Sequence, residues 1–298
     1  MNNSFFGIAV LLLFAGAVFG QPGEKLYRIF DSKGTPVAFD ELIASCGEAD
    51  AVFLGEYHDD AVGHAFQFEV FQAVVNRLNA ERKIILSLEM FERDVQVVLN
   101  EYLAGQITEN HFMLSSRPWG NYKTDYRPLV ELAKEKRLPV VAANAPRRYV
   151  NMVSRGGRNA LSGLSKEAKS WLAPLPYAEA SPEYEKKFKA LMGSSSEAMM
   201  GLDNILSSQS LWDATMAYWI ADSLKRNKGG LVVHLNGGFH TERRLGTIEH
   251  LAKYRKKAKA IVVNIRYEDD FRNFDKAKHT DSGDFVVLTD AKQPRSKR

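Results

Sequence analysis

Short apolar runs alternate with longer segments of helical periodicity along most of this chain, and the alternation limits the folds that it can adopt. The first two runs are Ala51–Leu54 and Ile84–Leu88, and between them Phe66, Val70 and Val74 recur at helical spacing. Strands separated by helices of roughly ten residues or more form parallel sheets through right-handed crossovers. Unbroken apolar strands also fit a sheet that is covered on both faces. The pattern predicts an α/β fold with a mainly parallel central sheet flanked by helices.

The remaining elements follow from the same pattern. Further strands are expected at Pro139–Ala143, Leu231–Leu235, Ala260–Asn264 and Asp284–Leu288. Further helices are expected at Asp94–Leu103, Leu129–Lys136, Leu211–Leu224 and Arg243–Tyr254. The rhythm is interrupted at about residues 151–208, which are rich in Ser, Ala, Met and Pro and predict short helices joined by loops. We therefore expect one α/β domain over residues 21–298, with a helical insertion at about 151–208.

The N-terminus predicts an export signal. Phe5–Phe19 is almost wholly apolar, and Val18 and Gly20 provide small side chains before Gln21, so residues 1–20 are expected to form a signal peptide cut after Gly20. The run is shorter than the roughly 20 residues that span a bilayer as a helix, although an uncleaved anchor stays an alternative because the segment before it lacks Lys and Arg. No other segment is expected to cross a membrane. The protein is therefore expected to be periplasmic or otherwise secreted.

Cysteine and charge content narrow the classes of partner. Cys46 is the only cysteine, so no intramolecular disulfide forms, no lipoprotein cysteine stands at the cleavage site, and the thiol is expected to be buried and inert. The formal net charge is +4, and part of the excess lies in the tail, at Lys292, Arg295, Lys297 and Arg298. A solvated tail explains this run better than a nucleic-acid site, and no nucleic-acid partner is expected.

Polar residues follow four of the predicted strands. In open α/β sheets ligands bind beyond the carboxyl ends of the strands, so these side chains are expected to meet at one edge. In chain order the candidates are Glu56, His58, Glu89, Asn144, Arg147, Arg148, His234, Asn236 and His240, to which Arg117 is added. Charged residues are rarely buried without a partner, because their desolvation is costly. The alternatives are that single residues cap the following helices, and that the arginines form internal salt bridges.

The expected cluster allows two kinds of chemistry. Two carboxylates and two imidazoles, from Glu56, His58, Glu89 and His240, suit a transition metal such as Zn²⁺, Mn²⁺, Co²⁺ or Fe²⁺. A metal-bound water with a carboxylate as base would make the protein a hydrolase. The forked guanidinium groups of the arginines suit carboxylate ligands instead. Two further histidines, His64 and His111, are expected at the surface.

The strand-end motifs also carry a family resemblance. Gly55-Glu56-Tyr57-His58 and Gly237-Gly238-Phe239-His240 resemble the two Gly-x-x-His motifs of the Tiki/TraB/erythromycin-esterase/ChaN superfamily. The stretches that point to its ChaN-like haem-binding branch are Leu88–Phe91, Tyr126–Leu129, Ala143–Arg147 and Asp213–Ala217. The resemblance covers roughly residues 50–290. It implies an exported α/β protein that binds haem and is linked to iron uptake.

The resemblance further implies a homodimer, since the studied branch member encloses two stacked haems in a dimer. In that member a tyrosine binds the haem iron, and a histidine is contributed nearby. The matching region here is the predicted insertion, which contains Tyr177 and Tyr184 but no histidine, so the haem ligand is left open. Haem binding needs apolar and aromatic surface and an axial donor. Two alternatives remain, a metal-dependent hydrolase that uses Glu56, His58, Glu89 and His240, and a non-catalytic module for a small anionic ligand.

Overall fold

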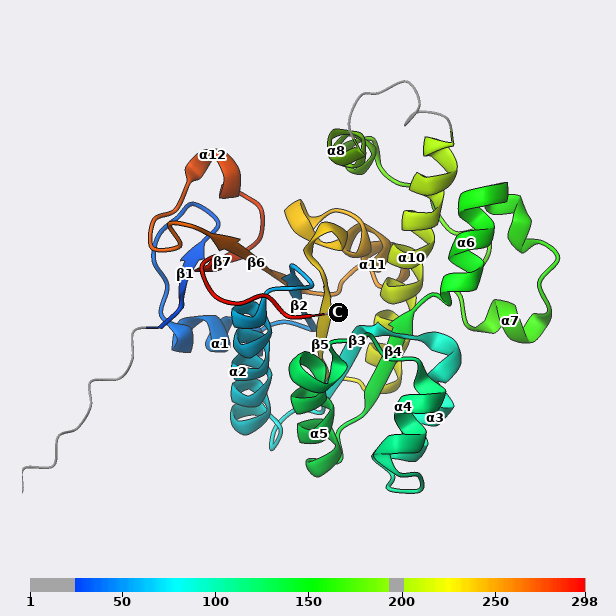
Figure 1. Cartoon of the computed structure of the whole chain (residues 1–298), viewed down its shortest axis with the longest axis horizontal. Helices are drawn as coiled ribbons and strands as arrows, with labels where there is room; N and C mark the ends of the chain where they lie inside the picture. Colours follow the sequence, from blue (N-terminus) through cyan, green and yellow to red (C-terminus); the bar gives the residue numbers. More distant parts are fainter. Residues whose placement is uncertain (1–24, 193–200, 298) are drawn as a thin grey trace, which may run out of the picture.

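A seven-stranded sheet forms the centre of the computed structural model, which describes residues 25–192 and 201–297 (Figure 1). The strand order is β1-β7-β6-β2-β5-β3-β4. All neighbouring strands are parallel except β1 and β7, which pair antiparallel at one edge. The bounds are β1 Tyr27–Asp31, β2 Ala51–Glu56, β3 Ile84–Glu92, β4 Val140–Asn144, β5 Leu231–Gly237, β6 Ala260–Glu268 and β7 Phe285–Asp290. The predicted α/β fold with a mainly parallel sheet is confirmed.

One strand has no counterpart in the sequence-based prediction. β1 contains the exposed Arg28 between buried Tyr27 and Ile29, so it alternates as an edge strand does and lacks the continuous apolar run of the central strands. The strands predicted at 84–88, 260–264 and 284–288 are present as β3, β6 and β7, and β3 and β6 continue beyond the predicted ends. The continuation of β3 to Glu92 brings Glu89 into the end of the strand.

Helices cover both faces of the sheet. On one face lie α1 (Phe39–Gly47), α2 (Ala61–Leu78), α3 (Gln96–Leu103), α4 (Glu109–Ser116) and α5 (Arg127–Glu135), and on the other lie α10 (Leu202–Arg226) and α11 (Thr247–Tyr254). Alternate residues of β2 enter the two cores: Val52 and Leu54 pack on the α2 side, whereas Ala51 and Phe53 pack on the α10 side. Burying a side chain such as Phe53 contributes about 1.5–3 kcal/mol. Cys46 is fully buried in the first core, as predicted, and burial raises its pKa to about 12.

The segment between β4 and β5 is helical. It contains α6 (Arg147–Gly156), α7 (Lys166–Ser170), α8 (Pro182–Met192) and then the 25-residue α10. Figure 1 shows α6, α7, α8 and the first turns of α10 gathered on one side of the molecule. The boundaries differ from the predicted 151–208, because α6 begins before this range and α10 runs from inside it to the predicted helix Leu211–Leu224 and beyond. Part of the predicted range, residues 193–200, lies outside the described residues. That the segment is an insertion stays a prediction.

The remaining elements are short. They are η1 (Arg93–Val95), the π-helical η2 (Tyr122–Tyr126), η3 (Arg158–Leu161), η4 (Gly238–His240), η5 (Glu242–Arg244) and α12 (Lys276–His279). Within residues 25–192 and 201–297, no helix combines the length and the apolar character needed to cross a bilayer. The predicted signal peptide, residues 1–20, lies outside the described part of the chain.

Candidate functional site

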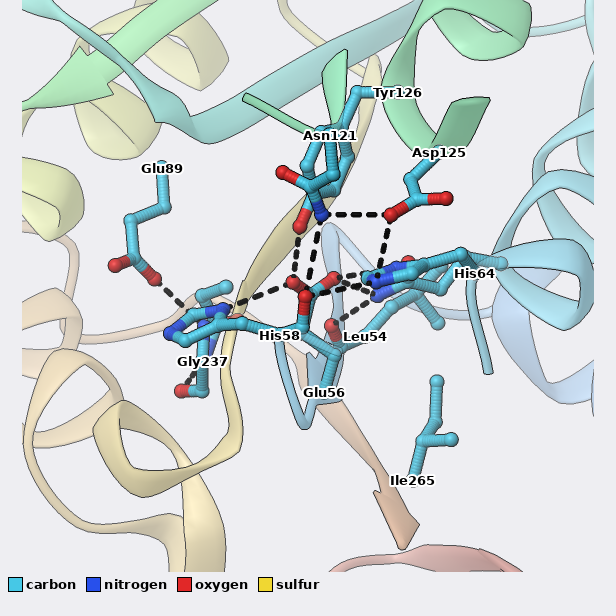
Figure 2. A network of polar contacts seen from close by, with 12 residues as sticks. Leu54, Glu56, His58, His64, Glu89, Asn121, Asp125, Tyr126, Gly237 and Ile265 are labelled. Atoms are coloured by element: carbon cyan, nitrogen blue, oxygen red, sulfur yellow. Dashed lines mark hydrogen bonds and ion pairs between the residues drawn. The ribbon is translucent and has the colours of Figure 1, made fainter. Parts of the chain in front are cut away.

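A buried carboxylate lies at the end of β2. Glu56 is 2% exposed, and its oxygens accept hydrogen bonds from the Tyr126 hydroxyl at 2.6 Å and from Nε2 of Gln67 at 2.7 Å. Nδ1 of His58 lies 3.0 Å from Glu56 Oε1, and Figure 2 marks this contact with a dashed line. Burial opposes ionisation of Glu56, but hydrogen bonds and charge from His58 and His64 prevail and lower its pKa to about 2. Glu56 is therefore an anion at neutral pH.

The cation that balances this anion is His64. Its Nδ1 lies 3.4 Å from Glu56 Oε2, and its Nε2 lies 3.5 Å from Asp125 Oδ2, which also accepts a hydrogen bond from Asn121 (Figure 2). Burial opposes protonation of His64, but Glu56 and Asp125 raise its pKa to about 9. The prediction that His64 lies at the surface is wrong, because it is 2% exposed. His111, in contrast, is exposed as predicted.

A second carboxylate–imidazole pair comes from the other face of the sheet. Nδ1 of His240, in η4, lies 2.9 Å from Oδ1 of Asp213, in α10, and the same oxygen accepts a hydrogen bond from the Thr247 hydroxyl at 2.7 Å. Burial opposes protonation of His240, but Asp213 and Glu89 raise the pKa of this imidazole above its ordinary value. Both His240 and Asp213 are buried. The pair therefore favours an imidazolium at His240.

Glu89 and Gly237 lie between the two pairs. Glu89 Oε2 accepts a hydrogen bond from the Gly237 amide at 2.6 Å, and Glu89 Oε1 lies 3.9 Å from Nε2 of His240. A methyl group on Gly237 would lie 2.8 Å from Nε2 of His58, which shows how closely this imidazole approaches the β5 backbone. The expected convergence of polar residues at one sheet edge therefore holds for His58, Glu89, Asn144, Arg147 and His240, which line one cavity, whereas the buried Glu56 does not line it.

A cavity of about 370 Å³ opens at this edge, and we refer to it as the strand-end cavity. It is lined by His58, Glu89, Glu92, Trp119, Asn144, Ala145, Arg147, Phe188, Leu191, Met192, Ile205, Gln209, Trp212, Gly237, Phe239 and His240. Trp119, Phe188, Trp212 and Phe239 give it aromatic walls, and the His58 and Trp119 ring centroids are 4.8 Å apart. A side cavity of about 510 Å³ shares Glu92, Trp119 and Arg147 with it and adds Met90, Arg117, Pro118 and Gly120.

Four of the predicted ligand-binding residues have other contacts. His234 is fully buried against Ser87, with 2.9 Å between Nδ1 and Oγ, and burial lowers its pKa to about 3. The Asn236 amide donates to the Gly237 carbonyl and to the Thr241 hydroxyl. Neither residue lines the strand-end cavity. Arg117 and Arg148 form ion pairs with Asp94, so the salt-bridge alternative holds for these two arginines, although their partners differ from Glu56 and Glu89.

Neither Tyr177 nor Tyr184, the two tyrosines of the predicted insertion, lines the strand-end cavity. The Tyr177 hydroxyl donates to the Ser207 carbonyl, and its ring lines a different cavity beside α6. Tyr184 is 1% exposed, and burial followed by the charge of Asp213 raises its pKa well above the ordinary value. Across the described ranges 25–192 and 201–297, no group of three or more His, Cys, Asp or Glu residues is arranged to hold a metal ion. The donors that reach the strand-end cavity are therefore the two separate imidazoles and the carboxylates beside them.

The residues that sequence reasoning missed include the buried ionisable side chains His64, Asp213 and Asp125. His64 lies seven residues before Phe71 and eleven before Val75, on the stripe of α2 that faces the core, and this spacing is a signal for its burial. Asp213 is an acidic residue among the buried apolar residues of α10, which is a signal for a buried partner. Asp125 has no comparable signal, because η2 is too short to show a periodicity.

The fold and the site together define an α/β protein with a ligand cavity beyond the carboxyl ends of a parallel sheet, bordered by two carboxylate-held imidazoles. The profile of the family described as "Haem-binding uptake, Tiki superfamily, ChaN" matches residues 42–251, more than two thirds of the chain, and the protein belongs to this family. The resemblance found in the sequence is thus confirmed. A search of curated proteins found no match for this chain.

Solved structures share the fold. ChaN of Campylobacter jejuni, described as binding haem cofacially, is 20% identical with a TM-score of 0.69, over 90% of this chain and 98% of that one. A succinoglycan biosynthesis protein is 11% identical with a TM-score of 0.52, over 88% of this chain and 93% of that one. At these identities the likeness concerns the fold alone.

Proposed function

We propose that this protein is an exported haem-binding protein of iron uptake and that the strand-end cavity receives the haem. The observation that carries the proposal is His58, whose imidazole lines a cavity with four aromatic walls while its Nδ1 is held by the buried Glu56. Haem sites combine apolar and aromatic surface with an axial donor, and this cavity has both. Membership of the haem-binding uptake family supports the same ligand.

His58 is the better iron ligand of the two imidazoles. With Nδ1–H donated to the Glu56 carboxylate, Nε2 keeps its lone pair and makes no hydrogen bond to any described residue. The negative charge of Glu56 is already balanced by His64. His240 differs, because Asp213 and Glu89 both favour its protonated form, which has no lone pair to offer. When bound, the haem iron would supply a site for Nε2 coordination, and the aromatic walls would hold the porphyrin.

Haemin titration of the purified protein tests the proposal. We expect saturable binding with a shifted Soret band at micromolar haemin, and a weaker complex with a different spectrum for His58→Ala. The control is His111→Ala, which changes an exposed histidine on α4 and is expected to bind as wild type does. Absence of a Soret change in the wild-type protein would overturn the proposal.

Export is supported by the apolar run Phe5–Phe19 and the small residues before Gln21. N-terminal sequencing of the protein recovered from the periplasm or the medium is expected to begin at Gln21. A chain that keeps Met1 and stays in the cytoplasm would contradict this part of the proposal.

The metal-dependent hydrolase alternative has no support, since the described residues contain no group of three metal ligands.

A further inference from the structure

The strand-end cavity and the side cavity meet at one arginine. Arg147 lines both, together with Glu92 and Trp119. We propose that Arg147, with the Asn144 amide and the N-terminus of α6, forms a carboxylate-binding subsite that receives a propionate group of haem. This inference rests on the proposed function and specifies how the ligand is held at its charged edge.

The first argument is the distribution of ion pairs among the three neighbouring arginines. Arg117 lies 2.8 Å from Asp94 and 3.1 Å from Glu92, and Arg148 lies 2.6 Å from Asp94. Arg147 forms no hydrogen bond or ion pair with any described residue, and its side chain is exposed. The two acidic residues are therefore occupied by Arg117 and Arg148. Arg147 alone can offer its guanidinium to a ligand.

The second argument is an oriented amide on a buried residue. Asn144 ends β4, is 7% exposed and lines the strand-end cavity. Its Oδ1 accepts a hydrogen bond from the Ala145 amide at 2.9 Å, which leaves Nδ2 as the donor that faces away from this contact. Nδ2 donates to no described residue. Because Asn144 lines the cavity, this free donor is available to a ligand oxygen there.

The third argument is the start of α6. Arg147 is its first residue, the residue before it is Pro146, and no side chain caps this helix. Its first turn also contains no acidic residue. The first amides of a helix lack intrahelical acceptors and carry a partial positive charge, which favours an anion. The helix end, the Asn144 amide and the Arg147 guanidinium thus offer donors on the same wall.

The wall also selects the type of anion. Two acidic residues, Glu89 and Glu92, line the same cavity and disfavour a doubly charged group such as a phosphate more than a singly charged one. A guanidinium matches a singly charged carboxylate in a bidentate geometry. Haem carries two such carboxylates on one edge of an otherwise apolar porphyrin. The same cavity offers the aromatic side chains of Trp119, Trp212 and Phe239 to the apolar part of the ring.

The test compares haemin with its dimethyl ester, in which both propionates are uncharged, in a detergent solution that keeps both monomeric. We expect wild-type protein to bind haemin about three- to tenfold more tightly than the ester, as one partly exposed charge pair allows. Arg147→Gln should lose most of this preference, and Arg147→Lys should keep part of it. The matched control is Arg155→Gln, which changes an exposed arginine of the same helix that lines neither cavity.

The outcomes separate the inference from the proposed function. If wild-type protein binds haemin and Arg147→Gln keeps the full preference for haemin over the ester, the subsite is wrong while haem binding stands. If Arg155→Gln loses the preference as Arg147→Gln does, the effect is one of general charge and the subsite is also wrong. If wild-type protein binds neither compound, both the subsite and the proposed function are overturned.

Discussion

Nδ1 of His58 lies 3.0 Å from Oε1 of Glu56, two residues earlier in the chain, and this contact determines what His58 can do. Glu56 is the last residue of β2, and His58 lies in the turn that follows, so the contact closes across the end of the strand. The carboxylate is buried and anionic, so it accepts a hydrogen bond from Nδ1–H and leaves Nε2 for the strand-end cavity. Carboxylate partners of this kind fix the tautomer of a ligating histidine and raise its basicity.

Removing the charge of Glu56 is therefore expected to weaken haem binding. We predict that Glu56→Gln lowers haemin affinity about 10- to 100-fold, the range seen when a hydrogen-bond partner of a metal-ligating histidine is changed. The measurement is a Soret titration, with the exposed Glu48→Gln as control. Wild-type affinity in Glu56→Gln would show that this contact does not prepare His58 for the iron.

The Glu56–His64 pair predicts that the stability of the apo-protein falls at both low and high pH, and we call these two declines the acid limb and the alkaline limb. The folded pKa of Glu56 is lowered to about 2, so its contribution is present above its ordinary value of 4.5 and is lost as the pH falls from 4.5 to 2. The folded pKa of His64 is raised to about 9, so its contribution is present below its ordinary value of 6.5 and is lost as the pH rises from 6.5 to 9. Both limbs report the same buried pair.

Urea unfolding of the apo-protein between pH 3 and pH 9 measures both limbs. His64→Gln is expected to be less stable than wild type at pH 6 and to lose the alkaline limb, because glutamine does not titrate. A decline between pH 6.5 and 9 that is as steep in His64→Gln as in wild type would assign the alkaline limb to another group.

The close approach of His58 to β5 predicts that Gly237 tolerates no side chain. A Cβ there would lie 2.8 Å from Nε2 and Cε1 of His58, so Gly237→Ala displaces the imidazole from the cavity wall. We expect haemin affinity to fall about tenfold or more and the free energy of unfolding to fall by about 1–3 kcal/mol, the usual cost of overpacking. The control is Gly163→Ala, since nothing lies within 4 Å of a Cβ at Gly163. Equal haemin affinities in the two variants would refute the prediction.

The fold was largely predictable because its central strands are unbroken apolar runs. β2 and β5 are buried at every residue, and such apolar runs can be recognised as strands from the local sequence alone. β1 escaped prediction because an exposed arginine interrupts its short apolar pattern. The bounds of the helical segment were also misplaced, because α6 and α10 pack on one another through Val153 and Leu211 and so share a core that no local pattern reveals.

The site was predictable only in part, for a related reason. Strand ends locate His58, Glu89 and His240, because parallel topology brings all carboxyl ends to one edge. Which side chains enter the cavity depends on partners that come from distant helices. Asp213, in α10, pairs with His240, and Asp94 forms ion pairs with Arg117 and Arg148. Which of the predicted residues remain available to a ligand is therefore visible only in the folded structure.

The last prediction distinguishes the two imidazoles that border the strand-end cavity. If His58 is the iron ligand, His58→Ala changes the Soret maximum and the visible bands, whereas His240→Ala keeps the wild-type band positions even where affinity falls. The reason is that Asp213 and Glu89 raise the pKa of His240 above its ordinary value, which favours the protonated form that cannot bind iron. His240→Ala also leaves Asp213 buried without its imidazole partner, and we expect a loss of about 3–5 kcal/mol in the free energy of unfolding. Spectra are therefore compared at temperatures where both variants are folded, as judged by far-UV circular dichroism. A shifted Soret maximum in folded His240→Ala together with an unchanged one in His58→Ala would reverse the assignment and make the Asp213–His240 pair the haem-facing ligand.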